Sequence, residues 1–221
     1  MRSVSVVISA LFLAACPTPP DTGSDAAQPA VDAGGPQYEP LSADESAGLA
    51  AALPTATQKT TRAIPESLLS SDDVALENDS FFEILDATGV LLGYGRDVFT
   101  PIECTSGACQ AIRFVLVFDG AVEFVAVFHP ASDSHDWKKY WQGEYLTFDD
   151  ADRARLREIL LHPPADLIAV TSIDDLVTSA TSTAPTQIEY QDDVVRGAAF
   201  TTYIVLQYML DSQQTIRQVI A

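Results

Sequence analysis

The chain has 221 residues, of which 31 are acidic and 12 are basic, so its formal net charge at pH 7 is -19. That charge argues against nucleic acid and anionic lipid surfaces as partners, because both are themselves negative. An acidic surface also suits basic partners, although its commonest role is solubility. The residues after position 40 are numerous enough for one domain with a hydrophobic core.

The N-terminus has the layout of a secretory signal. Met1 and Arg2 precede an apolar run over residues 4–15, which ends in small residues before Cys16. The run is shorter than the roughly twenty apolar residues that cross a bilayer. Residues 13–16 (Leu-Ala-Ala-Cys) resemble the lipobox of bacterial lipoproteins. The resemblance implies a signal peptide over residues 1–15 and acylation of Cys16; the alternative is an ordinary signal peptide that contains a cysteine.

The segment after Cys16 is predicted to be a membrane tether. By the same resemblance, Pro17 in place of Asp favours the outer membrane, facing the periplasm, over the inner membrane. Residues 16–40 are rich in Pro, Thr, Gly and Ala and lack an apolar period, which predicts disorder. We therefore expect a lipid-anchored protein of the cell envelope, with a single folded domain over residues 41–221.

The first half of this domain predicts mainly β-structure. Residues 42–52 predict a short helix that Ser42 caps, whereas residues 53–65 are Pro/Thr-rich and are expected to be irregular. Residues 81–85 and 90–95 flank a Gly-containing turn, a pattern typical of a β-hairpin. The sequence therefore predicts that the sheet begins near residue 80.

A second hairpin and two helices follow. Residues 111–118 and 121–128 are rich in Val, Ile and Phe and flank Asp119-Gly120, a strong hairpin signal. Residues 151–162 predict a helix, with Thr147 and Asp150 as a capping box and Pro163-Pro164 after its end. A last helix is expected over residues 193–210. Together these elements predict an α+β fold, in which an antiparallel sheet of two hairpins packs against segregated helices.

Two cysteines lie between the hairpins. Cys104 and Cys109 are separated by four residues, one of them Gly107. In an oxidising compartment this arrangement favours a small-loop disulfide, and a thiol-redox role is the alternative. The spacing differs from the Cys-x-x-Cys of thioredoxin-type sites, and two cysteines are too few for a zinc or iron–sulfur centre.

Other polar and aromatic residues have two interpretations each. His129 and His135 lie near Asp133 and Asp136 and could bind a metal ion, or they could be solvated in a polar loop. Four aromatic residues could form a stacking platform or could pack over the sheet edge; they are Trp137, Tyr140, Trp141 and Tyr145.

One segment suggests a cofactor. Residues 175–181 read Asp-Leu-Val-Thr-Ser-Ala-Thr. They resemble the signature of the FMN-binding domain in flavin subunits of sodium-pumping and Rnf-type electron-transport complexes: Asp, two variable residues, Ser or Thr, then Gly-Ala-Thr. The resemblance implies FMN esterified to Thr181. Asp175, Thr178, Ser179 and Ala180 are the other motif positions and would complete the FMN-binding segment.

The segment also departs from that signature. Ser179 stands where the family has Gly, and Pro185 follows where the family has a helix. A second, weaker copy over residues 193–202 has Ala199 at the acceptor position, which cannot form an ester. The order of predicted hairpins ahead of the motif also resembles that family, so the resemblance extends over residues 80–210.

The sequence is consistent with three interpretations of the function. The chain could be an electron carrier with covalent FMN on Thr181 and a redox protein as its partner. It could be a cofactor-free structural or interaction lipoprotein that uses a degenerate flavin-domain fold. The segment could also be a Ser/Thr-rich loop in an unrelated fold. None of the three requires a turnover enzyme.

Overall fold

A computed structural model of the chain describes residues 37–100, 112–131, 150–182 and 197–221, which lie in one compact unit, Pro36–Ala221. The strands are β1 (Glu39–Pro40), β2 (Ala56–Ala63), β3 (Ser80–Asp86), β4 (Leu91–Thr100), β5 (Ile112–Asp119) and β6 (Phe124–Phe128). The α-helices are α1 (Ala43–Leu49), α2 (Ser71–Ala75), α4 (Asp150–Leu161), α5 (Ala165–Ile168), α6 (Ile173–Ala180) and α7 (Gly197–Ile220), with a 3-10 turn, η1, at Glu66–Leu68.

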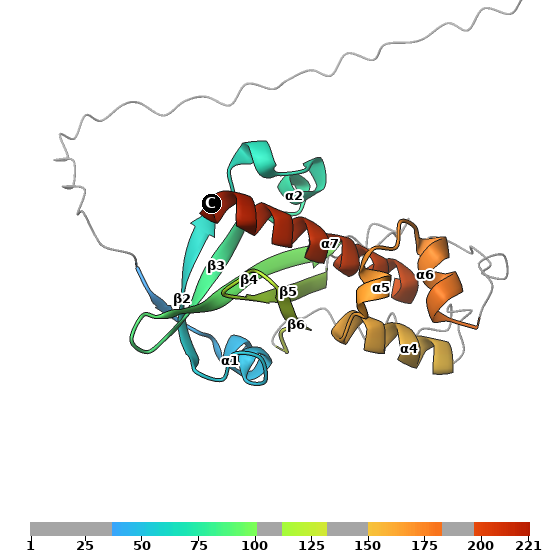
Figure 1. The fold of residues 1–221 in the computed structure, drawn as a ribbon, viewed down its shortest axis with the longest axis horizontal. Helices are drawn as coiled ribbons and strands as arrows, with labels where there is room; N and C mark the ends of the chain where they lie inside the picture. Colours follow the sequence, from blue (N-terminus) through green and yellow to red (C-terminus); the bar gives the residue numbers. More distant parts are fainter. Residues whose placement is uncertain (1–36, 101–111, 132–149, 183–196) are drawn as a thin grey trace, which may run out of the picture. The chain divides into compact units, whose positions relative to one another are not determined.

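The six strands form one sheet in the order β1-β2-β3-β4-β5-β6, and every neighbouring pair is antiparallel (Figure 1). The predicted α+β class is confirmed, as are both predicted hairpins, β3–β4 and β5–β6. The sheet nevertheless has two more strands than the two hairpins supply. β1 lies in the last two residues of the stretch predicted as tether.

The prediction of irregular structure over residues 53–65 is wrong, because β2 occupies most of that stretch. This strand pairs with β1 on one side and with β3 on the other. None of its side chains is fully buried, so the sequence lacks the apolar alternation by which a half-buried strand is recognised. Three threonines, which favour extended backbone, and the hydrogen bonds to both neighbours account for the strand.

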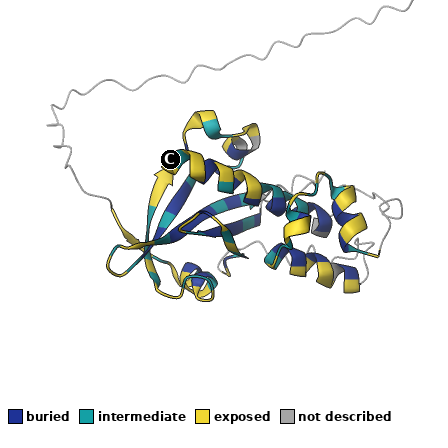
Figure 2. Cartoon of the chain, in the orientation of Figure 1, coloured by how far each residue is buried: buried dark blue, intermediate teal, exposed yellow. Residues whose placement is uncertain are grey.

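Both faces of the sheet are covered. Phe114, Leu116 and Phe118 of β5 lie in a large core with α4–α7, whereas Val115 and Val117 point to the opposite face, beneath α1. All five side chains are 0% exposed. Figure 2 shows the buried residues concentrated in the central strands and in the helix surfaces that face them. β5 is therefore a nearly continuous apolar run, as expected for a strand covered on both sides.

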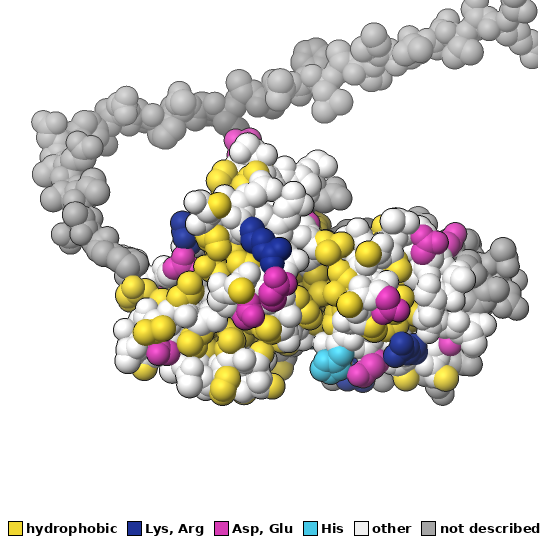
Figure 3. Space-filling model, viewed as in Figure 1, with side chains coloured by type: hydrophobic (Ala, Val, Ile, Leu, Met, Phe, Trp, Pro, Cys, Tyr) yellow, Lys and Arg dark blue, Asp and Glu magenta, His cyan; other side chains and the backbone are white. Residues whose placement is uncertain are grey.

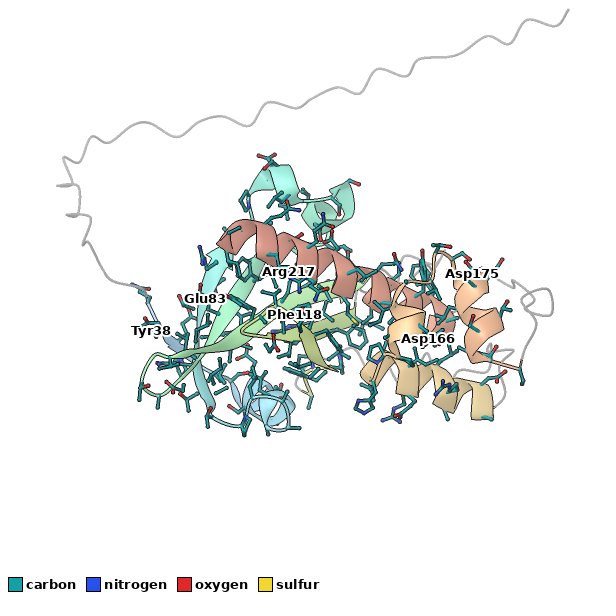
Figure 4. The ribbon with its side chains drawn as sticks, viewed as in Figure 1. Tyr38, Glu83, Phe118, Asp166, Asp175 and Arg217 are labelled. Carbon is teal, nitrogen blue, oxygen red and sulfur yellow. The ribbon has the colours of Figure 1, made fainter. Side chains whose placement is uncertain are left out.

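Helix α7 extends past the residue at which the sequence predicts its end. It continues from Leu210 to Ile220, and the prediction that it ends at Leu210 is wrong. The added turns carry polar residues that interrupt the apolar spacing. Gln213 donates to the Val122 carbonyl at 2.8 Å, and Arg217 pairs with Glu123 at 2.6 Å. Figure 4 labels Arg217 on this helix, and at that place Figure 3 shows a basic side chain beside acidic ones.

A buried arginine connects the sheet to two helices. The guanidinium of Arg96, in β4, is 0% exposed and contacts Asp73 of α2 at 2.8 Å and Asp211 of α7 at 3.0 Å. It also donates to Ser212 Oγ at 3.1 Å and to the Asn78 carbonyl at 2.9 Å. Among the buried side-chain nitrogen and oxygen atoms of the described residues, Arg96 Nε is the only one without a hydrogen-bond partner. Arg96 therefore fixes α2 and α7 against the same strand.

Helix α1 begins with the predicted cap. Ser42 Oγ accepts from the Glu45 amide, and the Glu45 carboxylate accepts from the Ser42 amide at 2.8 Å. The same carboxylate binds Lys59 of β2 at 2.5 Å. Burial alone would raise the pKa of Glu45, but the hydrogen bonds from Lys59 and Ser42 outweigh it and hold the pKa below the ordinary 4.5.

Because the pKa of Glu45 is lowered on folding, its ionised form stabilises the folded state, and this contribution is lost as the pH falls through the folded pKa. We expect Glu45→Gln to lower the free energy of unfolding at pH 7 by about 1–2 kcal/mol, since the ion pair with Lys59 is lost and one oxygen is left where two accept. The difference should shrink below pH 4.5, the ordinary value. Urea unfolding from pH 7 to pH 3 measures this. The exposed Glu66 provides the control Glu66→Gln, and an effect of Glu45→Gln that does not change with pH would contradict the assignment.

Candidate functional site

The segment that resembles the flavin signature lies on helix α6. Ser172 caps this helix by accepting from the Asp175 amide at 3.1 Å, and Thr171 donates to the Asp175 carboxylate at 2.9 Å. Hydrogen bonds from Ser172 and Thr171 hold the pKa of Asp175 below its ordinary value. Figure 4 shows Asp175 on the outer side of the α4–α6 helices. The first motif residue thus stabilises a helix N-terminus.

The side chains in the middle of the motif alternate between the core and the solvent with the period of an α-helix. Leu176 and Val177 are 0% exposed and belong to the core that α7 also lines. Ala180 is buried on the same side, whereas Thr178 and Ser179 are exposed. Ser179, at the family's glycine position, thus lies on the outer side of a regular helix, where a glycine is not needed.

Thr181, the predicted FMN acceptor, is the C-terminal cap of α6. Its amide donates to the Val177 carbonyl at 3.0 Å, and its Oγ1 donates to the same carbonyl at 2.8 Å. The side chain is half-buried. Thr181 thus uses its hydroxyl hydrogen to satisfy a carbonyl in the last turn of the helix.

The residue after the motif attaches α6 to α4. Asp152, 5% exposed, accepts from the Ser182 amide at 2.8 Å and from the Ser182 hydroxyl at 3.2 Å. An acidic side chain and the last carbonyls of α6 therefore lie at the end of the motif. Both carry negative charge or partial negative charge.

The weaker downstream copy is partly described. Its residues 197–202 lie in α7, and Ala199, at the acceptor position, is 0% exposed. Farther along the same helix, Tyr203 Oη donates to the Thr171 carbonyl at 3.1 Å, and Gln207 donates to the Val170 carbonyl at 3.0 Å. This part of α7 thus holds the segment that precedes α6.

Several other predicted features lie outside the described residues. They are Cys16, Cys104 and Cys109, the capping residue Thr147, His135 with its neighbouring acids, and the four aromatic residues between positions 137 and 145. His129 is described, and its Nδ1 lies 2.8 Å from the Arg113 carbonyl. The described residues contain no group of His, Cys, Asp or Glu that could hold a metal ion.

The sequence gives no indication of a polar pocket beside α1. Asp97 of β4 and Arg113 of β5 form a bidentate pair, with Nη2 2.9 and 3.0 Å from the two carboxylate oxygens. Burial raises the pKa of Asp97, and the Arg113 guanidinium offsets part of that effect. Arg113, Glu45 and Lys59 line a pocket of about 470 Å³. These residues come from separate elements, and the register of the sheet and the packing of α1 on it bring them together.

Neither family nor relatives identify the site. No protein-family model, curated protein or solved structure matches the chain. Within the described part of the chain, no helix combines the length and apolar character required to cross a membrane.

Proposed function

We propose that the chain is a lipid-anchored domain of the cell envelope that acts as a cofactor-free interaction or structural module, attached to the membrane through Cys16. The observation that carries the cofactor-free part is the hydrogen bond from Thr181 Oγ1 to the Val177 carbonyl. The motif that resembles a flavin site is accounted for as a helix with a polar cap at each end.

A phosphoester at Thr181 would act against these contacts. Esterification removes the hydroxyl hydrogen, so the bond to the Val177 carbonyl would be lost. It would also place an anionic phosphate at the C-terminal end of α6, where the helix dipole is negative, and close to Ser182, which already binds the Asp152 carboxylate. Anions are stabilised at the opposite end of a helix.

The second candidate is the covalent FMN carrier with a redox partner, and the sequence motif favours it. That proposal needs Thr181 to leave its cap and residues 175–181 to form an FMN-binding segment. The two proposals make opposite predictions for one experiment.

The test is expression of the full chain in an exporting host together with a flavin transferase, followed by in-gel fluorescence after denaturation. We expect no flavin fluorescence from wild type, from Thr181→Ala or from Thr178→Ala, the matched control on the same helix. Fluorescence that is present in wild type and in Thr178→Ala but absent in Thr181→Ala would establish covalent FMN and overturn the cofactor-free proposal.

The same samples test the anchor. The intact mass of the mature chain should correspond to a chain that begins at Cys16 and carries acyl groups, and Cys16→Ser should lack these groups. A wild-type chain without acyl groups would contradict the lipid anchor and leave the cofactor result unaffected.

A further inference from the structure

The pocket beside α1 combines cationic and anionic groups from four elements of the fold. Lys59 comes from β2, Arg113 from β5 and Glu39 from β1. Asp44, in the acidic first turn of α1, lines the same pocket. Its volume of about 470 Å³ lies within the range of small-molecule sites. This pocket is built without any residue of α6.

The two cations keep unused hydrogen-bond donors. Arg113 uses Nε and Nη2 for Asp97, and its Nη1 has no hydrogen-bond acceptor among the described residues. The Lys59 ammonium has three N–H groups, and its one hydrogen bond within the described residues is to Glu45. A planar guanidinium edge and an ammonium in one pocket are suited to a carboxylate.

The buried acid of the pocket, Glu45, already accepts hydrogen bonds from the protein, whereas the exposed rim carries an acid that does not. Glu45 is 3% exposed, and its two oxygens accept from Lys59 and from the Ser42 amide. Glu39 is exposed at the edge of the sheet, and no residue of the described part of the chain bonds its carboxylate. The rim therefore attracts a cationic group, while the interior offers donors to an anionic one.

The pocket also has apolar surface. Leu41 and Pro130 line the pocket together with the charged residues. A ligand that carries both charges and a small apolar body would satisfy all three surfaces, whereas a simple anion would also face the acidic rim and the net charge of -19.

We infer that this pocket binds a small zwitterion of the amino-acid or dipeptide class, with its carboxylate against Arg113 and Lys59 and its ammonium against Glu39. Binding is non-covalent and does not depend on Thr181. It adds a ligand to the interaction role proposed above, and it stands or falls independently of the flavin experiment.

Isothermal titration of the purified full chain against the twenty amino acids and a set of alanine-containing dipeptides tests this inference. We expect at least one zwitterion to bind. Its N-acetyl and its amide derivatives, which lack one charge each, should bind at least about tenfold more weakly, since a charge-assisted hydrogen bond accounts for roughly that factor. Failure of every zwitterion to bind, or equal binding of the N-acetyl derivative, would overturn the inference.

Two variants locate the site. Arg113→Gln and Glu39→Gln should each weaken binding by about tenfold or more. Arg113→Gln also removes the ion-pair partner of Asp97 and could therefore change the fold near the pocket. Glu39→Gln breaks no contact among the described residues, so a loss of binding in this variant reports on the pocket itself. The matched control is Arg62→Gln. Arg62 also lies on β2 but outside the pocket, where it forms an exposed ion pair with Glu83 of β3, so this variant should bind like wild type. Unchanged affinity in both pocket variants would overturn the assignment.

Discussion

Replacing Arg96 by Met should lower the free energy of unfolding by about 3–5 kcal/mol, because it leaves the buried carboxylate of Asp73 without its ion-pair partner. Asp73 is 1% exposed and, among the residues that the structure describes, would retain only its bonds from Ser70. The loss is a large share of the roughly 5–15 kcal/mol that holds a typical domain folded. Urea unfolding followed by circular dichroism at pH 7 measures it.

Matched variants separate this effect from the loss of any surface charge. Arg62 forms an ion pair of similar length with Glu83, at 2.7 Å, but its side chain is 43% exposed. Arg62→Met should therefore cost less than about 1 kcal/mol. The double variant Arg96→Met/Asp73→Asn should be more stable than the sum of its single variants predicts, since it also removes the unpaired charge. A cost for Arg96→Met no larger than that for Arg62→Met would contradict the role assigned to the buried pair.

Replacing Gly93 by Ala should destabilise the protein by at least about 1–3 kcal/mol, because the added methyl group has no room. A Cβ at this position would lie 2.2 Å from the Phe118 carbonyl oxygen, which is backbone of the neighbouring strand. Gly93 pairs with Asp119 in the β4–β5 register, so relief requires the two strands to separate locally. Thermal unfolding measures the cost, and amide hydrogen exchange in β5 reports the opening.

Gly120, one residue beyond the end of β5, supplies the control. A Cβ there would meet its nearest atom, the Leu92 carbonyl oxygen, at 3.8 Å, which is an ordinary contact, and the residue does not have a positive φ. Gly120→Ala should therefore leave stability within about 1 kcal/mol of wild type or raise it slightly. If the two variants were equally stable, the close approach of β4 and β5 at Gly93 would be contradicted.

Elements with local signals could be predicted from the sequence. The cap at Ser42, the turn after Asp86 and the stop at Pro163 each depend on residues a few positions apart, so no tertiary information is needed. Helix α6 has a cap signal of the same kind at Ser172 and Asp175, but it is not among the predicted helices.

In the β5–β6 turn, the local sequence predicts the hairpin but not the backbone conformation of each turn residue. Asp119-Gly120 predicts the hairpin, yet the positive φ of 61° falls on Val122 and not on Gly120. The Asp119 carboxylate binds the amides of Ala121 and Glu123, and Val122 is 2% exposed in the core. Burial of the valine side chain and the hydrogen bond from Gln213 to its carbonyl accompany this turn geometry.

The sequence by itself determined the α+β class, the two hairpins and the capped helix α1, because each follows from short-range pattern and turn chemistry. Only the tertiary structure decided which polar residues meet. The extension of α7 beyond Leu210 accompanies bonds to Arg96, Val122 and Glu123. Strands β1 and β2 join the sheet because β2 pairs with β1 on one side and with β3 on the other. The charged groups around Arg96 and in the pocket beside α1 are far apart in the chain. Their meeting follows from the strand register and from the packing of α1, α2 and α7 on the sheet.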